Sequence, residues 1–338
     1  MAVEGLAMKF PSHVKRVLLT GGAGFIGSHV LDLLAPSVVH FTVYDNLTNG
    51  KLEYIEAHLS RPNVTFVKAD ILDLERLVEA TRGHDVVWHL AANTDIINSH
   101  DQPSRDLEDC AVGTFNAVEA MRRTGVRDIL FASSGAVYGN ICAEQSVSED
   151  AGPLLPVSTY GAGKIASEAF ISSFCHVYGL RGWMYRFGNV IGARMTHGVI
   201  YDFLGRLRQD SSCLLVRGDG RQEKNYFLVE ECIDGMLYGY CNIPMDDDNP
   251  CGVFNLGTST VTKVIDIART IVEETGLSDA RIQIEGTKKA WPGDQPRVHF
   301  EIDKMAELGW RSRLNSDQSV RIAVRRMLNK PDSFAWVI

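Results

Sequence analysis

The fold is decided by the stretch Val17-Leu18-Leu19-Thr20-Gly21-Gly22-Ala23-Gly24-Phe25-Ile26-Gly27-Ser28-His29. An apolar β-rich run leads into a glycine-rich turn and then an apolar periodic run, which predicts a buried strand, a tight turn and a helix. Gly21, Gly24 and Gly27 lack a Cβ, so they let the backbone turn sharply and approach a pyrophosphate closely. The first amides of the helix, at Phe25 and Ile26, would face the phosphates. A strand, turn and helix without a ligand is the alternative interpretation.

Strand and helix signals alternate through the first half of the chain. We predict strands at 39–44, 63–67, 85–90, 127–133 and 183–187, and helices at 74–80, 105–123 and 160–178. Such alternation implies parallel strands joined by right-handed crossover helices, with helices on both faces of the sheet. The predicted fold class is therefore α/β, a Rossmann-type doubly wound parallel sheet.

The second half of the chain has a less regular pattern. We predict helices at 199–208, 262–274 and 319–329, strands at 213–217 and 281–284, and a solvated loop at 246–250. These elements suggest a smaller mixed α/β substrate-binding lobe. It would cover the carboxyl ends of the parallel strands, where ligands lie in such sheets.

Composition limits the classes of partner. The chain has 338 residues, 45% of them hydrophobic, and a formal net charge of −8, which argues against nucleic acid or an anionic membrane as a partner. Its 7 Cys are odd in number and form no C-x-x-C pair, a pattern typical of reduced thiols in a cytoplasmic protein. No apolar run has transmembrane length, and the first thirteen residues lack a signal-peptide core, so we expect a loosely held tail. We expect no metal site.

Acidic and small residues follow the predicted strands. Asp45 ends the second strand, where a carboxylate can accept hydrogen bonds from an adenosine ribose and would repel a 2′-phosphate, so it favours NAD over NADP. Asp70-Ile71 and Leu90-Ala91-Ala92 end the next two strands and would lie beside the adenine and the cofactor backbone. The alternatives are a turn-forming Asp45 and plain strand ends. We interpret His89 as a satisfied core histidine.

The reactive residues of the site are predicted in Tyr160-Gly161-Ala162-Gly163-Lys164. Residues four apart share a helix face, so the phenol and the ammonium point the same way. A tyrosine with a pKa of about 10 is a poor base, but a positive charge at ~4 Å would lower that pKa by up to roughly three units. Ser133 and Ser134 end an apolar strand and could contact a substrate oxygen. We therefore predict that Ser134, Tyr160 and Lys164 move a hydroxyl proton; a surface helix pair with two turn serines is the alternative.

Together these motifs resemble those of an extended short-chain dehydrogenase/reductase, and more narrowly those of NAD-dependent nucleotide-sugar epimerases and dehydratases. They are Thr20–Gly27, Tyr44-Asp45-Asn46, His89–Ala92, Ser133–Gly139 and Tyr160-x-x-x-Lys164, within a likeness that runs from about Val14 to Leu328. The resemblance implies that Ser134, Tyr160 and Lys164 are catalytic. It also implies that NAD⁺ stays bound and that Asn46, Ser133, Tyr160 and Lys164 contact it.

The same resemblance implies how the chain binds substrate. Asn189, Val199, Ile200, Lys224 and Arg297 would hold a nucleotide-sugar, which we expect to be UDP-linked. Residues 14–187 with about 224–254 would form the NAD-binding domain, and 188–223 with 255–330 the sugar-nucleotide lobe. The helices at 105–123 and 160–178 would pair in a homodimer. Lys224 and Trp291 stand where many members have Arg, and Cys110 stands where Asn is common.

The residues before Val137-Tyr138-Gly139 bear on the reaction. Dehydratases usually have acidic residues there and decarboxylases tend to keep a Glu, whereas this chain has Gly135 and Ala136. Without an acid to protonate a leaving hydroxyl, we expect a 4-epimerase that works through a transient 4-keto sugar. The small Val298 would leave room for an N-acetyl group at C2. A dehydratase, decarboxylase or 4-dehydrogenase stays open, as does an inactive NAD-binding regulatory protein.

Overall fold

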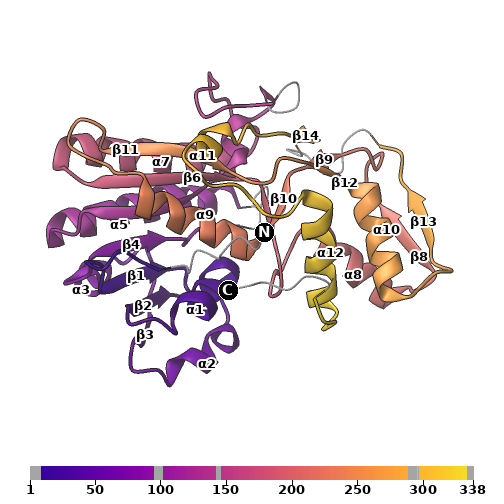
Figure 1. Ribbon diagram of the computed structural model, residues 1–338, viewed down its shortest axis with the longest axis horizontal. Helices are drawn as coiled ribbons and strands as arrows, with labels where there is room; N and C mark the ends of the chain where they lie inside the picture. The colour runs from indigo at the N-terminus through magenta and orange to yellow at the C-terminus, as the bar shows by residue number, and fades with distance from the viewer. Residues whose placement is uncertain (1–8, 95–101, 142–145, 288–294, 296, 333–338) are drawn as a thin grey trace.

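A seven-stranded parallel sheet forms the centre of the molecule (Figure 1). The computed structural model describes residues 9–94, 102–141, 146–287, 295 and 297–332. The strand order β11-β6-β5-β4-β1-β2-β3 confirms the predicted doubly wound α/β fold. The strands are β1 (Arg16–Thr20), β2 (His40–Asp45), β3 (Val64–Lys68), β4 (Val86–His89), β5 (Asp128–Ser134), β6 (Arg181–Phe187) and β11 (Cys251–Leu256).

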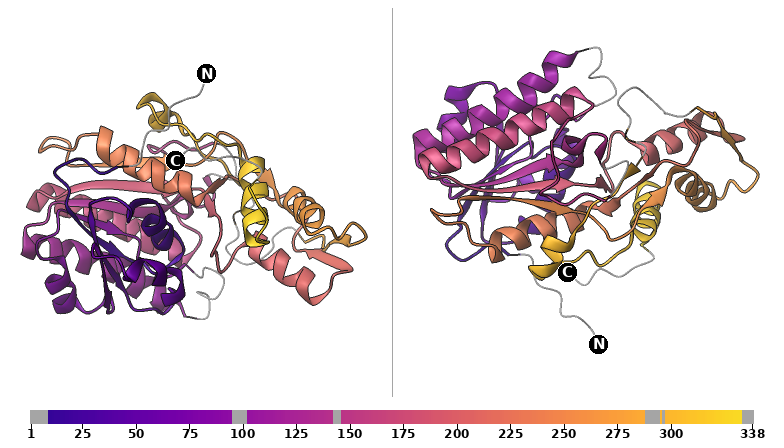
Figure 2. Two further views of the ribbon diagram at one scale, coloured as in Figure 1. Left: turned by 60° about the horizontal axis from the view of Figure 1, so that its bottom comes forward. Right: turned by 90° about the horizontal axis from the view of Figure 1, so that it is seen from above.

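Helices cover both faces of this sheet (Figure 2). On one face, α3 (Leu74–Thr81), α5 (Gly113–Thr124) and α7 (Thr159–Tyr178) pack over strand residues such as Leu18 and Phe131. On the other face, α1 (Phe25–Leu34) and α9 (Val229–Asn242) pack over Leu19 and Trp88. Neighbouring strand residues point to opposite faces, so each strand is buried on both sides.

The helix predicted at 105–123 is interrupted. It consists of α4 (Pro103–Asp106), a π-helical turn η3 (Leu107–Val112) and α5, so the predicted long helix is confirmed and the π-helical turn inside it was not predicted. Ser167 Oγ of α7 donates to the Cys110 carbonyl oxygen at 3.0 Å and to the Gly163 carbonyl oxygen at 2.8 Å. A neighbouring hydroxyl thus satisfies a carbonyl of the wide turn, which helps to explain why the irregular geometry is tolerated.

A second hydrophobic core, which includes Ile200, Phe203, Ile267 and Ile271, unites the elements that we call the small lobe. They are α8 (Val199–Gln209), β8 (Cys213–Val216), α10 (Val264–Thr275), β13 (Arg281–Ile284) and α12 (Ser316–Met327). Short sheets join it to the large sheet: β7 (Asn189–Ile191) pairs with β10 (Tyr226–Leu228), and β9 (Glu223–Lys224) lies between β12 (Thr262–Lys263) and β14 (Arg297–Val298). The remaining turns are η1 (Leu52–Tyr54), α2 (Glu56–Leu59), η4 (Gly135–Tyr138) and α11 (Asp303–Glu307).

Several boundaries differ from the predictions. The helix expected from residue 262 begins at Val264, because 262–263 pair with β9. The last helix begins at Ser316, where the Asn315 side chain accepts from the Gln318 amide in a capping box. Helix α9 and strand β11 were not predicted as elements. Within 246–250, residues 246–249 form an exposed loop as expected.

The expected loose tail is wrong for its described part. The ring of Phe10 lies 5.9 Å from that of Trp88 and 6.1 Å from that of Tyr240, and so extends the core between the sheet and α9. Residues 1–8 lie outside the described part of the chain. Among the helices that the structure describes, none combines the length and apolar character needed to span a bilayer.

Candidate active site

The turn between β1 and α1 has a shape that only glycine fits. Gly21 has a φ of +67°, and a Cβ there would lie 2.7 Å from the Ala91 backbone nitrogen. A Cβ on Gly27 would lie 2.5 Å from the Gly22 Cα. These contacts are shorter than van der Waals distances, so both positions exclude larger residues. The chain then enters α1 at Phe25, and the amides of the first helical turn have no carbonyl partner within the helix.

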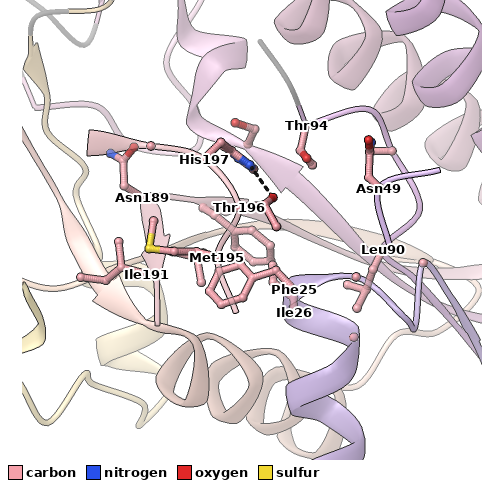
Figure 3. A pocket seen from close by; sticks show the side chains of 18 of the residues that line it. Phe25, Ile26, Asn49, Leu90, Thr94, Asn189, Ile191, Met195, Thr196 and His197 are labelled. Atoms are coloured by element: carbon pink, nitrogen blue, oxygen red, sulfur yellow. Dashed lines mark hydrogen bonds between the residues drawn. The ribbon is translucent and has the colours of Figure 1, made fainter. Parts of the chain in front are cut away.

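A cavity of about 460 Å³ lies beside this turn, between the ends of the parallel strands and the small lobe. In Figure 3, Asn189 and Ile191 lie on one side of the cavity, and Asn49 and Leu90 on the other. Its volume is in the range of small-molecule sites. Seventeen of the predicted site residues line it: Gly21, Gly24, Phe25, Ile26, Gly27, Asp45, Asn46, Ile71, Leu90, Ala91, Ala92, Ser133, Ser134, Tyr160, Asn189, Val199 and Lys224.

Four predicted residues lie outside this lining. Asp70 stands behind Asn46, whose Nδ2 donates to its Oδ2 at 2.9 Å. Ile200 is fully buried in the core of the small lobe. Arg297 pairs with Glu223, with 3.2 Å between its Nε and the Glu223 Oε1. Lys164 is buried behind the reactive side chains.

Asp45 is held rigidly at the cavity wall. Its Oδ2 accepts from the Ala23 amide at 3.0 Å and its Oδ1 from the Leu47 amide at 2.8 Å. Burial raises the pKa of this carboxyl, while the two backbone hydrogen bonds lower it. The oxygens keep further lone pairs, so the carboxylate can still accept hydrogen bonds from ribose hydroxyls.

Tyr160 and Ser134 both line the cavity wall, and the Ser134 side chain lies near enough to the phenol to lower its pKa. Burial raises the pKa of the Tyr160 phenol above 10, and the nearby Cys110 and Asp106 add to this shift. The expected lowering of this pKa by Lys164 is therefore wrong for the protein without ligands. The Lys164 Nζ lies 5.7 Å from the centre of the Tyr160 ring, so the pair is arranged as predicted, but loss of solvent dominates.

Lys164 lies on the same face of α7, one turn after Tyr160. Its side chain is 2% exposed, and its Nζ donates to the Ala132 carbonyl oxygen at 2.7 Å. The Nζ also lies 4.8 Å from the centre of the Phe131 ring. Burial lowers the pKa of this amine, and the nearby Cys110, Glu168 and Asp106 oppose that shift. These contacts fix the amine directly behind the end of β5.

His89 is a core residue, as predicted. Its Nδ1 lies 2.7 Å from Thr20 Oγ1 and its Nε2 lies 3.1 Å from Thr114 Oγ1. Complete burial, together with the Lys164 charge, lowers its pKa to about 3. The ring is therefore neutral at physiological pH and joins β1, β4 and α5.

Comparison with known proteins identifies the family. Residues 17–257 match the profile of the NAD dependent epimerase/dehydratase family. The chain belongs to this family. The predicted resemblance is thereby confirmed.

Relatives with assigned names cover nearly the whole chain. UDP-glucose 4-epimerase of Mycolicibacterium smegmatis is 32% identical over 93% of this chain and 99% of its own. The crystal structure of UDP-glucose 4-epimerase from Thermotoga maritima with UDP-glucose is 29% identical, with a TM-score of 0.81 over 93% of this chain and 98% of that one. That of the Thermus thermophilus UDP-glucose 4-epimerase with NAD is 30% identical, with a TM-score of 0.80 over 93% and 99%. A plant UDP-glucuronic acid decarboxylase and a mouse dTDP-D-glucose 4,6-dehydratase also match, at 27% and 25% identity.

Further residues that line the cavity were not among the predicted site residues. They come mainly from the segment after β7 and from the small lobe: Met195, Thr196, His197, Arg206, Arg217 and Gln222. Only the basic character of Arg206 and Arg217 could have suggested anion binding from the sequence. Elsewhere, Val298 is buried beside Phe300 and does not line the cavity. Trp291 lies outside the described residues. Within the described ranges, no group of three or more His, Cys, Asp or Glu side chains could hold a metal ion.

Proposed function

We propose that this protein is an NAD-dependent 4-epimerase of UDP-sugars that works through a transient 4-keto sugar. The observation that carries the proposal is that Ser134 and Tyr160 both line the cavity, with the Lys164 Nζ 5.7 Å from the centre of the Tyr160 ring. The UDP-glucose 4-epimerases among its relatives support the same reaction. UDP-glucose and UDP-galactose, or their N-acetyl analogues, are the proposed substrates.

The glycine turn and Asp45 fit a bound dinucleotide. Gly21, Gly24 and Gly27 all line the cavity, and the space that a Cβ would fill is left for a ligand to approach the backbone. Asp45, with Asn46 beside it, would take the adenosine ribose, and Ile71 and Leu90–Ala92 would flank the rest of the cofactor. When bound, NAD⁺ would supply the hydride chemistry at C4 of the sugar and positive charge near Tyr160.

Tyr160 would act as the base that takes the proton from O4 and later returns it. Its pKa is raised by burial in the protein without ligands, so it must fall when the site is filled. The Lys164 ammonium favours this change, because a nearby cation stabilises a phenolate. Ser134 would hydrogen-bond O4 and keep it against the phenol. Asn189, Val199 and Lys224 would hold the nucleotide end, with Arg297 reached through a side-chain rearrangement.

The packing around Gly135 favours epimerisation over loss of water. A Cβ at this position would lie 2.1 Å from Cζ of Phe300, so an acidic side chain does not fit there. The next residue, Ala136, has no acidic side chain either, and its backbone amide donates to Ser134 Oγ at 3.2 Å. Dehydration needs a positioned acid for the leaving hydroxyl. Epimerisation needs only the reversible transfer of the O4 proton and the C4 hydride.

We also propose that two copies pair through α5 and α7. These helices lie side by side on the outer face of the large sheet (Figure 2). Together with η3 they carry a set of exposed apolar side chains, in which Phe115 and Phe170 pack edge to face. We call it the helix-pair patch: Leu107, Val112, Phe115, Phe170, Val177 and Tyr178. Clustered exposed apolar residues of this kind mark association surfaces. The division at 14–187 with 224–254 against 188–223 with 255–330 is likewise proposed, in agreement with β11 lying in the large sheet.

A turnover assay on a panel of UDP-sugars tests the function. Purified protein with NAD⁺ should convert UDP-glucose to a product of unchanged mass, identified as UDP-galactose by NMR. Tyr160→Phe should lower kcat by about 10²-fold or more, because the phenol proton is lost. Tyr178→Phe, at the other end of α7, is the control and should keep the wild-type rate.

Three results would contradict the proposal. Loss of mass on turnover would indicate a dehydratase or decarboxylase. Wild-type turnover by Tyr160→Phe would exclude Tyr160 as the base. Silence on every UDP-sugar, with NAD⁺ still bound, would indicate an inactive regulatory protein.

A further inference from the structure

Two successive turns of α7 are hydrogen-bonded to neighbouring residues at the end of β5. One turn after Tyr160, Lys164 Nζ donates to the Ala132 carbonyl oxygen at 2.7 Å. One turn further, Glu168 Oε1 accepts from Ser133 Oγ at 2.5 Å. Because residues four apart share a helix face, one stripe of α7 sets the position of the reactive end of β5.

Glu168 is itself held by a buried two-pronged ion pair. Its Oε1 accepts from Arg186 Nε at 3.0 Å and its Oε2 from Arg186 Nη2 at 2.7 Å. Arg186 lies on β6 directly opposite Ser133 in the strand register. Planar pairing of this kind fixes both direction and distance, so the carboxylate has little freedom to leave Ser133.

Arg186 is anchored in turn. Its Nη1 donates to Tyr138 Oη at 3.0 Å and to the Glu149 carbonyl oxygen at 3.2 Å, and its guanidinium lies 4.8 Å from the centre of the Tyr138 ring. Tyr138 Oη donates to Asn255 Oδ1 at 2.7 Å, which extends the network to β11. The arginine is only 4% exposed. The network therefore joins three neighbouring strands to α7, and neither Glu168 nor Arg186 itself lines the cavity.

The charges around Lys164 come from several elements: Tyr160 and Glu168 on α7, Asp106 on α4, Cys110 on η3, and His89 on β4. Burial raises the pKa of the Cys110 thiol and lowers that of His89, so both are neutral near pH 7. Glu168 and Asp106 are the carboxyl groups near Lys164, and both raise its pKa. Asp106 accepts from Asn93 Nδ2 at 2.9 Å and from Thr159 Oγ1 at 2.6 Å, away from β5.

We infer that Glu168 is a positioning residue of this site: it fixes Ser133, and through it Ser134, against α7, and its negative charge keeps Lys164 an ammonium. Arg186 holds Glu168 in place for both tasks. The catalytic part of this inference rests on the proposed function, whereas the effect on Lys164 does not. A neutral Lys164 would give no support to a phenolate at Tyr160, so the carboxylate acts on the reaction through its neighbour.

The test compares Glu168→Gln with Glu274→Gln. Glu274 is a matched control, since it is also buried and pairs with Arg321 and Arg325 at 2.8 and 3.0 Å, but it joins α10 and α12 in the small lobe. NMR titration of ¹³C-labelled lysine, assigned with Lys164→Met, reads the Lys164 pKa without turnover. Glu168→Gln should lower that pKa by about one unit or more, whereas Glu274→Gln should leave it unchanged.

Turnover supplies the second measurement. In Glu168→Gln the alkaline fall of kcat should move to lower pH, and kcat near pH 8 should drop by about tenfold with KM almost unchanged. Glu168→Asp should restore part of the rate, because it keeps the charge. Ser133→Ala should lower kcat without moving the alkaline fall, because it removes the hydrogen bond alone.

The outcomes separate this inference from the proposed function. If the wild type turns over no UDP-sugar but Glu168→Gln still lowers the Lys164 pKa, the function fails and the electrostatic role stands. An unchanged Lys164 pKa in Glu168→Gln overturns the inference, whatever the activity. Should Glu168→Gln not fold because Arg186 is left unpaired, Glu168→Gln/Arg186→Met removes both charges. It should still lower the Lys164 pKa, by less, and an unchanged value overturns the inference there as well.

Discussion

At the scale of single residues, the buried surroundings of Tyr160 and Lys164 disfavour the charged forms that a proton transfer between them and a substrate needs. Burial raises the pKa of the phenol and lowers that of the amine, so both shifts favour the uncharged pair. A proton-transfer role needs the reverse, a lysine that stays charged beside a phenol that can ionise. The neighbouring groups that favour a charged Lys164 are Cys110, Glu168 and Asp106. In the protein without ligands the Tyr160 phenol is thus neutral.

The buried His89 gives a prediction for stability. Its pKa is about 3 in the folded protein against 6.5 when exposed, so below pH 6.5 only the unfolded chain takes up this proton. The free energy of unfolding should therefore fall as pH decreases from about 6.5 toward 3. Between pH 7 and 5 the contribution of His89 is about 2 kcal/mol. Urea unfolding at both pH values should show a decrease smaller by about this amount in His89→Gln.

The control for that experiment is His176→Gln, because His176 is exposed on α7. It should show the wild-type difference between pH 7 and 5. An equal difference in the wild type and in His89→Gln would mean that His89 takes up its proton in the folded state, in conflict with its burial.

The sequence predicted which residues form this site better than it predicted their pKa values. The four-residue spacing of Tyr160 and Lys164 predicts a shared helix face, and the structure confirms it. The direction of the Tyr160 pKa was wrong, because spacing reports a neighbouring charge but not the loss of solvent around a phenol. Glu168 follows Lys164 by the same four-residue spacing on α7, but its ion-pair partner Arg186 lies on strand β6. Only the strand register brings the two together.

At the scale of elements, the turn between β1 and α1 is set by contacts that leave no room for a side chain. Gly27 meets the backbone of Gly22, which cannot move without displacing the end of β1. Elsewhere the predictions depended on regular alternation. That alternation breaks where the chain leaves β6 for the small lobe and later returns to the large sheet. Helix α9 and strand β11, which follow this return, were therefore not predicted. The π-helical turn has no signal in periodicity, because it is stabilised by Ser167 from α7.

Two glycine substitutions separate the turn from an ordinary helix position. Gly27→Ala places a Cβ 2.5 Å from the Gly22 Cα, so it should lower the free energy of unfolding by about 2 kcal/mol or more and weaken NAD⁺ binding. Gly205→Ala, inside α8, meets no described atom within 4 Å and should instead raise stability by about 0.5–1 kcal/mol. Urea unfolding and calorimetric titration with NAD⁺ measure both effects. A stable Gly27→Ala that binds NAD⁺ normally would contradict the structural reading of the turn.

At the scale of the whole molecule, the two outer layers differ. On one face of the large sheet, α1 and α9 share a continuous core that takes in Phe10 and Trp310. On the opposite face, α5 and α7 bury their inner sides but expose the helix-pair patch, in which Phe115 packs edge-on against Phe170 at 5.4 Å between ring centres. The small lobe lies away from these helices (Figure 1), so in a single chain it cannot cover them. A second copy can, with the patch of each copy facing that of the other.

Substitution of single patch residues tests this assembly. The wild type should sediment as a dimer at micromolar concentration. Val177→Glu, 64% exposed in the single chain, should weaken association by about tenfold or more, because pairing would bury the new charge. Val38→Glu makes the same change at a residue that is 90% exposed but remote from the patch, and it should leave the dimer intact. Sedimentation equilibrium measures both dissociation constants. A monomeric wild type, or equal effects of the two substitutions, would show that the patch is not the interface; a selective effect of Val177→Glu would place the pairing on the outer side of α7, the helix whose inner side carries Lys164 and Glu168.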